Sequence, residues 1–143
     1  MVDSRPLFVD SSYLFASTNS RDQWHATAVK WRMRLEASRQ RLITTEFILV
    51  EFADGLAETG FRSQAVGTIE TLRASSVAEI VPVDHLFDAA LALYRTRPDK
   101  GWSLTDCASF VVMGERGLSA ALTSDHHFRQ AGFVPLLLDH PAR

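Results

Sequence analysis

Several features that mark specialised classes of protein are scarce in this chain. Cys107 is the one cysteine among 143 residues, so neither an internal disulfide nor a site of paired thiolates can form. No apolar run is long enough to cross a bilayer, and the first residues, MVDSRPLFVD, are charged where a signal peptide needs an apolar centre. We therefore expect a cytoplasmic protein without a membrane anchor.

A large surplus of charge is also missing. Lys and Arg number 15 and Asp and Glu 17, which gives a formal net charge of -2. This balance argues against tight nonspecific binding of nucleic acid through a basic surface. It leaves open a nuclease that holds phosphates through metal ions and a few arginines. The most basic stretch, KWRMRLEASRQR at 30–41, could follow RNA phosphates or could be the solvated face of a helix.

The alternation of short apolar runs with longer amphipathic stretches predicts one α/β domain over residues 1–143. No repeat and no Gly-, Ser- or Pro-rich linker divides the chain. The apolar runs lack polar alternation, which is typical of parallel strands covered on both faces. We predict a three-layer α/β/α fold with a mostly parallel sheet of about five strands. The expected strands are 6–10, 41–45, 78–83, 118–123 and 134–138, and the expected helices are 22–40, 46–58, 62–74, 85–95, 103–116 and 125–131.

Four acidic residues fall at informative places in this pattern. Asp10 closes the first expected strand and Asp125 the fourth, so both lie at the carboxyl edge of the sheet, where ligands of such folds bind. These two strands are neighbours if the strand order reverses at the first strand. Asp106 lies in the first turn of the helix that leads to the fourth strand. Glu51 interrupts the apolar run FILVEF in the helix after the second strand.

Carboxylates that converge on one cleft repel one another, and some would bind protons at neutral pH. A divalent cation removes this conflict. Oxygen ligands without a cysteine pair favour Mg²⁺ or Mn²⁺ over Zn²⁺. Such an ion activates water and neutralises charge on a phosphoryl group, so the residues predict phosphodiester hydrolysis.

Each acid also has a purely structural interpretation. Asp10 and Asp125 can cap the helices that follow them, and Ser103 with Asp106 has the spacing of a capping box. Glu51 has no capping role, and its simplest alternative is a side chain that reaches solvent from the edge of an apolar face. Independent caps need not gather on one sheet edge, which favours the metal site for the set.

The chain resembles PIN-domain proteins of the kind found as VapC toxins in bacterial toxin–antitoxin pairs. The matching stretches are FVDSSYLFA, TTEFILVEFADGL, GWSLTDCASFVVMGERG and ALTSDHHFRQAGF, in the family's order. The resemblance implies a three-layer α/β/α fold and an Mg²⁺- or Mn²⁺-dependent ribonuclease. It also implies a homodimer that a cognate antitoxin holds inactive.

Carried over by position, the resemblance assigns the metal site to the four acids. Asp10 and Asp106 take the place of primary ligands, Glu51 that of a ligand that also orients the attacking water, and Asp125 completes the set. Four hydroxyl residues are expected to support the site, namely Ser11, Thr105, Thr123 and Ser124. The adjacent His126 and His127 are no required part of the family's acidic set. We expect them at a helix start, with a phosphate contact by a protonated ring as the lesser alternative.

Other functions stay open at this point. A catalytically silent PIN-like module would bind a protein partner and need no metal. A DNA-directed nuclease would use the same acids. A phosphotransfer enzyme with a second Asp two residues after the first is disfavoured, because Ser12 holds that place. A dinucleotide enzyme is disfavoured because no Gly-rich loop follows the first strand.

Overall fold

The chain folds around a five-stranded sheet in which all neighbouring strands are parallel. The computed structural model describes residues 5–139, so residues 1–4 and 140–143 of the predicted domain lie outside the described residues. The strand order is β3-β2-β1-β4-β5, with bounds Leu7–Val9 (β1), Leu42–Thr45 (β2), Ala78–Val81 (β3), Ala120–Leu122 (β4) and Val134–Pro135 (β5). The predicted fold class is confirmed.

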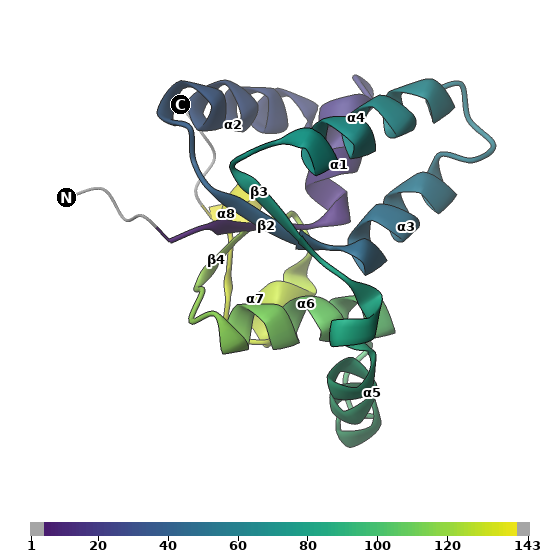
Figure 1. Cartoon of the computed structure of the whole chain (residues 1–143), viewed down its shortest axis with the longest axis vertical. Helices are drawn as coiled ribbons and strands as arrows, with labels where there is room; N and C mark the ends of the chain where they lie inside the picture. The colour runs from purple at the N-terminus through teal and green to yellow at the C-terminus, as the bar shows by residue number, and fades with distance from the viewer. Residues whose placement is uncertain (1–4, 140–143) are drawn as a thin grey trace.

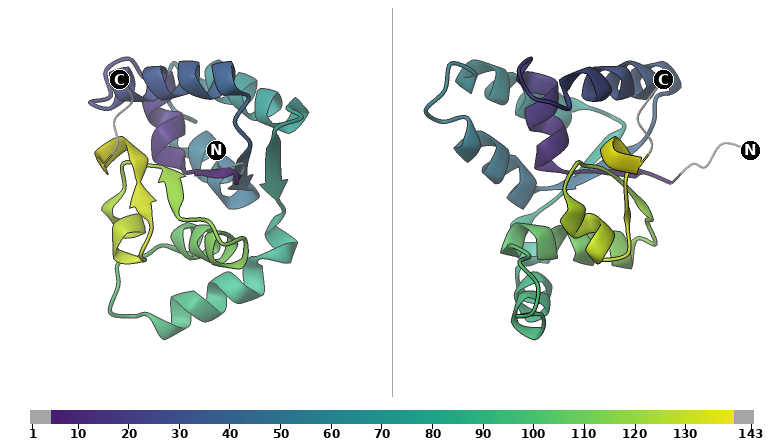
Figure 2. Two further views of the ribbon diagram at one scale, coloured as in Figure 1. Left: turned by 90° about the vertical axis from the view of Figure 1, so that its left-hand side faces the viewer. Right: turned by 180° about the vertical axis from the view of Figure 1, so that it is seen from behind.

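Helices cover both faces of the sheet (Figure 1). On one side lie α1 (Ser11–Thr18), α2 (His25–Ser38), α3 (Glu46–Gly55) and α4 (Arg62–Ala74). On the other lie α5 (Phe87–Thr96), α6 (Leu104–Glu115) and α7 (His126–Gln130), and the short η1 (Val83–His85) precedes α5. The short α8 (Leu136–Asp139) follows β5 and lies on the side of α1 and α2 (Figure 1 and Figure 2). The strand order reverses at β1, and right-handed crossovers then place the two sets of helices on opposite faces. The views in Figure 2 show the same layers.

The two central strands are buried on both faces. Phe8 and Val9 of β1 and Ala121 and Leu122 of β4 are at most 1% exposed. Both strands lie between two helix layers, so each residue meets apolar neighbours whichever face it points to. This explains why these runs are apolar throughout instead of alternating.

The register of β1 and β4 places functional residues side by side. Val9 pairs with Leu122, and the ladder continues one step further, because Asp10 N donates to the Leu122 carbonyl at 3.2 Å. Asp10 and Thr123 therefore leave the sheet together at its carboxyl edge. The expectation that the first and fourth strands are neighbours is confirmed.

Some predicted boundaries are wrong. The fifth strand was expected over 134–138 but ends at Pro135, and α8 follows. Leu137 N donates to the Thr123 carbonyl at 3.2 Å, so the chain turns over the end of β4. The helix expected from residue 22 begins at His25, because Asp22 Oδ1 accepts from Trp24 N at 2.8 Å and holds a turn there. The helix expected over 46–58 ends at Gly55.

None of the helices in the described part of the chain is both long enough and apolar enough to cross a membrane.

Candidate metal centre at the carboxyl edge of the sheet

Asp10 lies at the middle of the carboxyl edge and is 3% exposed. It is the N-cap of α1, and its Oδ2 accepts hydrogen bonds from Ser12 Oγ at 2.8 Å and Thr123 Oγ1 at 2.6 Å. Ser12 N lies 3.4 Å from the same oxygen. All these donors meet Oδ2, so Asp10 Oδ1 receives no hydrogen bond from the described residues.

Asp106 and Asp125 approach from the helices α6 and α7. Asp106 is the N3 residue of a capping box, in which Ser103 N donates to Asp106 Oδ2 at 3.1 Å. Asp125 is the N-cap of α7, and its Oδ1 accepts from His127 N at 2.9 Å. His127 joins the two acids, because its Nδ1 lies 3.1 Å from Asp106 Oδ2 and 3.4 Å from Asp125 Oδ1.

Glu51 reaches the site from α3 and is half-buried. Its Oε1 accepts a hydrogen bond from Ser11 Oγ, which begins α1 directly after Asp10. Glu51 is therefore fixed toward the other acids and does not reach freely into solvent. The hydrogen bond from Ser11 favours the site role over a side chain that only reaches solvent from the edge of an apolar face.

The capping interpretation is confirmed for Asp10, Asp106 and Asp125, and the three caps also lie at one edge of the sheet. A helix that follows a parallel strand starts at the carboxyl edge, so a carboxylate that caps such a helix lies at that edge by construction. Each cap occupies one oxygen of its carboxylate. Asp10 Oδ1, Glu51 Oε2, Asp106 Oδ1 and Asp125 Oδ2 receive no hydrogen bond from the described residues. Each of the four carboxylates is therefore held by hydrogen bonds to one oxygen and has its other oxygen free to bind a ligand.

Burial and mutual repulsion disfavour the charged forms of these acids. Desolvation raises the pKa of Asp10 to about 6, against hydrogen bonds from Thr123 and Ser12 that lower it. Desolvation also raises the pKa of Glu51 and of Asp106, and the negative charge of Asp125 adds to the increase at both. Within the described residues, the His127 ring opposes this increase at Asp106, and a divalent cation among the free oxygens would relieve the repulsion that remains.

The predicted supporting residues differ in their contacts. Ser11 holds Glu51, and Thr123 donates to Asp10 and accepts from Asp125 N at 3.0 Å. Ser124 contributes its backbone, since Ser124 N donates to Ser12 Oγ at 3.0 Å. Within the described residues, the Thr105 hydroxyl makes no hydrogen bond to any of the acids, and only its carbonyl is used, by Ser109 Oγ.

Two residues near the acids were not predicted to belong to the site. Ser12 bridges Asp10 and the β4–α7 turn, and its signal in the sequence was its place two residues after a capping Asp. His127 was expected at a helix start, where it lies, but it also contacts Asp106. Nothing in the spacing of residues 106 and 127 predicts that contact, since it depends on how α6 and α7 pack.

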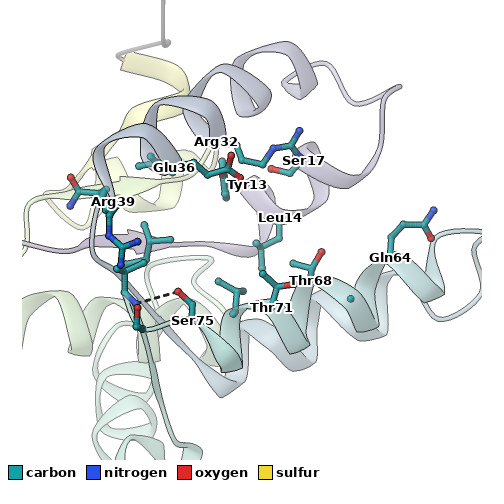
Figure 3. A pocket seen from close by; sticks show the side chains of 17 residues that line it. Tyr13, Leu14, Ser17, Arg32, Glu36, Arg39, Gln64, Thr68, Thr71 and Ser75 are labelled. Atoms are coloured by element: carbon teal, nitrogen blue, oxygen red, sulfur yellow. Dashed lines mark hydrogen bonds between the residues drawn. The ribbon is translucent and has the colours of Figure 1, made fainter.

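A hollow lies away from the acids. It has a volume of about 780 Å³ and lies between α1, α2 and α4 (Figure 3). Tyr13, Leu14 and Ser17 of α1 line one wall and Thr68 and Thr71 of α4 another. Among the described residues, Glu36 is the one acid in its lining, which also includes Arg32 and Arg39. This hollow therefore lacks the convergent acids of a metal centre.

The fold and this edge define a class: a three-layer α/β/α protein with four carboxylates gathered around one end of a parallel sheet. The family model for the PIN domain matches residues 7–134, and the chain belongs to that family.

Two known proteins are similar along nearly the whole chain. The "23S rRNA-specific endonuclease VapC20" of Mycobacterium tuberculosis is 29% identical over 129 residues, which cover 90% of this chain and 95% of that protein. The crystal structure of VapC20, described as a "Sarcin-Ricin loop cleaving toxin", matches with a TM-score of 0.77 at 30% identity, over 90% of this chain and 97% of the other. FitAcB from Neisseria gonorrhoeae matches with a TM-score of 0.59 at 20% identity over the same shares, which supports the fold.

Proposed function

We propose that this protein is an Mg²⁺- or Mn²⁺-dependent endoribonuclease and the toxin of a toxin–antitoxin pair. The observation that carries the proposal is the set of free oxygens on Asp10, Glu51, Asp106 and Asp125, each on a carboxylate whose other oxygen is already bound. Fixed carboxylate oxygens without a thiolate are the donors that Mg²⁺ and Mn²⁺ prefer. Family membership and the similarity to an rRNA endonuclease support the same reaction.

The chain's own residues would act as follows. Asp10 and Asp106 would hold the ion, and Thr123 and Ser103 would keep these carboxylates in place through the hydrogen bonds described above. When bound, the ion would activate water and neutralise charge on the scissile phosphate. Glu51, oriented by Ser11, would position the attacking water and accept its proton.

The remaining acid and the partners complete the proposal. Asp125 would contribute its free oxygen directly or through water. We expect the protein to be a homodimer, and we expect its antitoxin to lay a segment across the acids, with a cationic side chain among the carboxylates. Such a cation would relieve the same repulsion that the metal relieves and would exclude RNA from the edge.

Cleavage of RNA by the purified, antitoxin-free protein tests the proposal. The assay compares Mg²⁺, Mn²⁺ and EDTA, with ribosomal RNA and unrelated RNAs as substrates. Asp106→Asn is the active-site variant, and Asp54→Asn, which changes an exposed acid one turn further along α3 than Glu51, is the matched control. We expect metal-dependent cleavage that Asp106→Asn abolishes and Asp54→Asn retains. Full activity of Asp106→Asn would refute the assignment.

The same experiment separates the alternative functions. Single-stranded and duplex DNA of matched sequence, offered beside the RNA, would be cut by a DNA-directed nuclease. A silent binding module would cleave neither and would show no stabilisation by Mg²⁺ or Mn²⁺.

A further inference from the structure

Two adjacent imidazoles lie next to the last of the four acids. Neighbouring residues of a helix point about 100° apart and do not ordinarily face each other. His126 and His127 depart from this rule, because their ring centroids are 4.5 Å apart. Both rings turn toward one oxygen, with Asp125 Oδ1 lying 3.7 Å from His126 Nδ1 and 3.4 Å from His127 Nδ1.

These distances match the spacing of ligands around a single ion. Two donor atoms that each bind a tetrahedral metal at about 2.1 Å lie about 3.4 Å apart. The nitrogen of His126 is too far from Asp125 for a hydrogen bond, and its side chain is 67% exposed, so packing does not hold the ring there. Asp106 Oδ2, 3.1 Å from His127 Nδ1, is a fourth donor within reach of the same group.

We propose that Asp125, His126 and His127 form a mixed carboxylate–imidazole site that binds a transition-metal ion, Zn²⁺ most tightly, in preference to Mg²⁺. The chemistry of the donors sets this preference. Imidazole suits Zn²⁺, whereas Mg²⁺ keeps oxygen ligands and several of its waters. Mn²⁺ ranks below Zn²⁺ for a site of nitrogen and oxygen donors. The predicted order of affinity is therefore Zn²⁺, then Mn²⁺, then Mg²⁺.

This site shares Asp125 and, through its fourth donor, Asp106 with the proposed nuclease centre, but it adds two imidazole ligands that a purely carboxylate centre does not have. His127 could have a second role, in which its Nδ1 only holds Asp106 in place and binds no metal. In that case His126 would have no part in metal binding either. Substitution of His126 alone therefore separates the two roles. Because its side chain is mostly in solvent, its removal leaves the fold intact.

Calorimetric titration of the full-length, metal-free protein with Zn²⁺, Mn²⁺ and Mg²⁺ tests the inference. We expect one Zn²⁺ per chain, bound at least about a hundredfold more tightly than Mg²⁺. His126→Ala should weaken Zn²⁺ binding at least about tenfold, weaken Mn²⁺ binding less, and change Mg²⁺ binding less than about twofold. His127→Asn should also weaken Zn²⁺ binding at least about tenfold, and it is not used to judge Mg²⁺ binding because His127 contacts Asp106 and Asp125. His85→Ala removes an exposed imidazole outside the group and should change none of the three.

A second measurement locates the ion. In nuclear magnetic resonance spectra, the ring signals of His126 and His127 should move on addition of Zn²⁺ and stay in place with Mg²⁺, while those of His85 stay in place with both. Unchanged Zn²⁺ affinity in His126→Ala, or Zn²⁺ binding no tighter than that of Mg²⁺, would overturn the inference. RNA cleavage is not measured here, so failure of this site and failure of the nuclease proposal are distinguishable.

Discussion

The two edges of the sheet hold their charged residues in opposite environments. At the carboxyl edge, Asp10 and Asp106 are 3% and 8% exposed, and desolvation raises the pKa of both. At the amino edge, Arg41 precedes β2 and Arg116 follows α6, and both are exposed. Arg116 is paired with Glu79 of β3 through hydrogen bonds of 2.9 and 2.6 Å. The net charge of -2 conceals this separation.

Only one of the two charged edges opposes folding. Solvated ion pairs such as Arg116–Glu79 contribute little to stability in either direction. Burial of the Asp10 and Asp106 carboxylates destabilises the metal-free folded chain, and capping does not require four acids at one place. Capping alone would be satisfied by Ser, Thr or Asn. The proposed metal site would account for the excess of negative charge at the carboxyl edge.

The largest expected effect is on catalysis. Asp10→Asn should lower the rate of RNA cleavage at least about a thousandfold, because loss of a metal ligand exceeds the 10–100-fold cost of losing a supporting residue. Arg41→Ala, which removes a charge from the opposite edge, should leave the rate within about twofold. The rates are compared at saturating Mg²⁺. An equal loss of cleavage rate in Asp10→Asn and Arg41→Ala would show that the carboxyl edge has no special role in catalysis.

The next effect concerns stability: Asp10→Asn, which should lower activity, should raise the stability of the metal-free protein. The pKa of Asp10 is raised from 3.8 to about 6, so the folded state favours the protonated form, and its stability falls as the pH rises from about 4 to 6. Asp10→Asn cannot ionise and should make the metal-free protein more stable by about 3 kcal/mol above pH 6. The gain should shrink toward pH 4.

Urea unfolding of both proteins in EDTA across pH 4 to 7.5 measures this difference. Excess Mg²⁺ should narrow the gap, because the ion stabilises the wild-type protein and binds the variant poorly. A wild-type protein that is the more stable of the two at pH 7.5 in EDTA would show that Asp10 is not under electrostatic stress.

A smaller effect is expected at Glu51. Ser11→Ala removes the hydrogen bond that fixes Glu51 and should lower the rate of cleavage about tenfold. Ser38→Ala is the control, since Ser38 donates only to carbonyls at the end of α2, near the amino edge. If Ser11→Ala retained the full rate, Glu51 would need no fixed orientation for its role.

The sequence predicted the parts of the site that depend on strand order and helix starts. Asp10 and Asp125 follow apolar strands, and the parallel arrangement places both at one edge. The contacts of His127 with Asp106 and of Ser12 with Ser124 N join residues 21 and 112 positions apart. They depend on the angle and distance at which helices pack, which no local pattern encodes. The early end of β5 has the same origin, because Leu137 N bonds to Thr123 at the end of β4.

The smallest predicted effect lies in the backbone of the amino edge. Arg39 has φ 51°, a left-handed conformation, and Gln40 N donates to the Leu35 carbonyl at 3.1 Å in the pattern of a Schellman motif. Arg39→Gly should raise the free energy of unfolding by about 0.5–1 kcal/mol, because glycine adopts this conformation without the Cβ clash. Arg39→Ala removes the same charge but keeps the clash, so it should give no gain. If both variants were stabilised equally, the gain would come from loss of the Arg39 charge and not from relief of the left-handed backbone conformation.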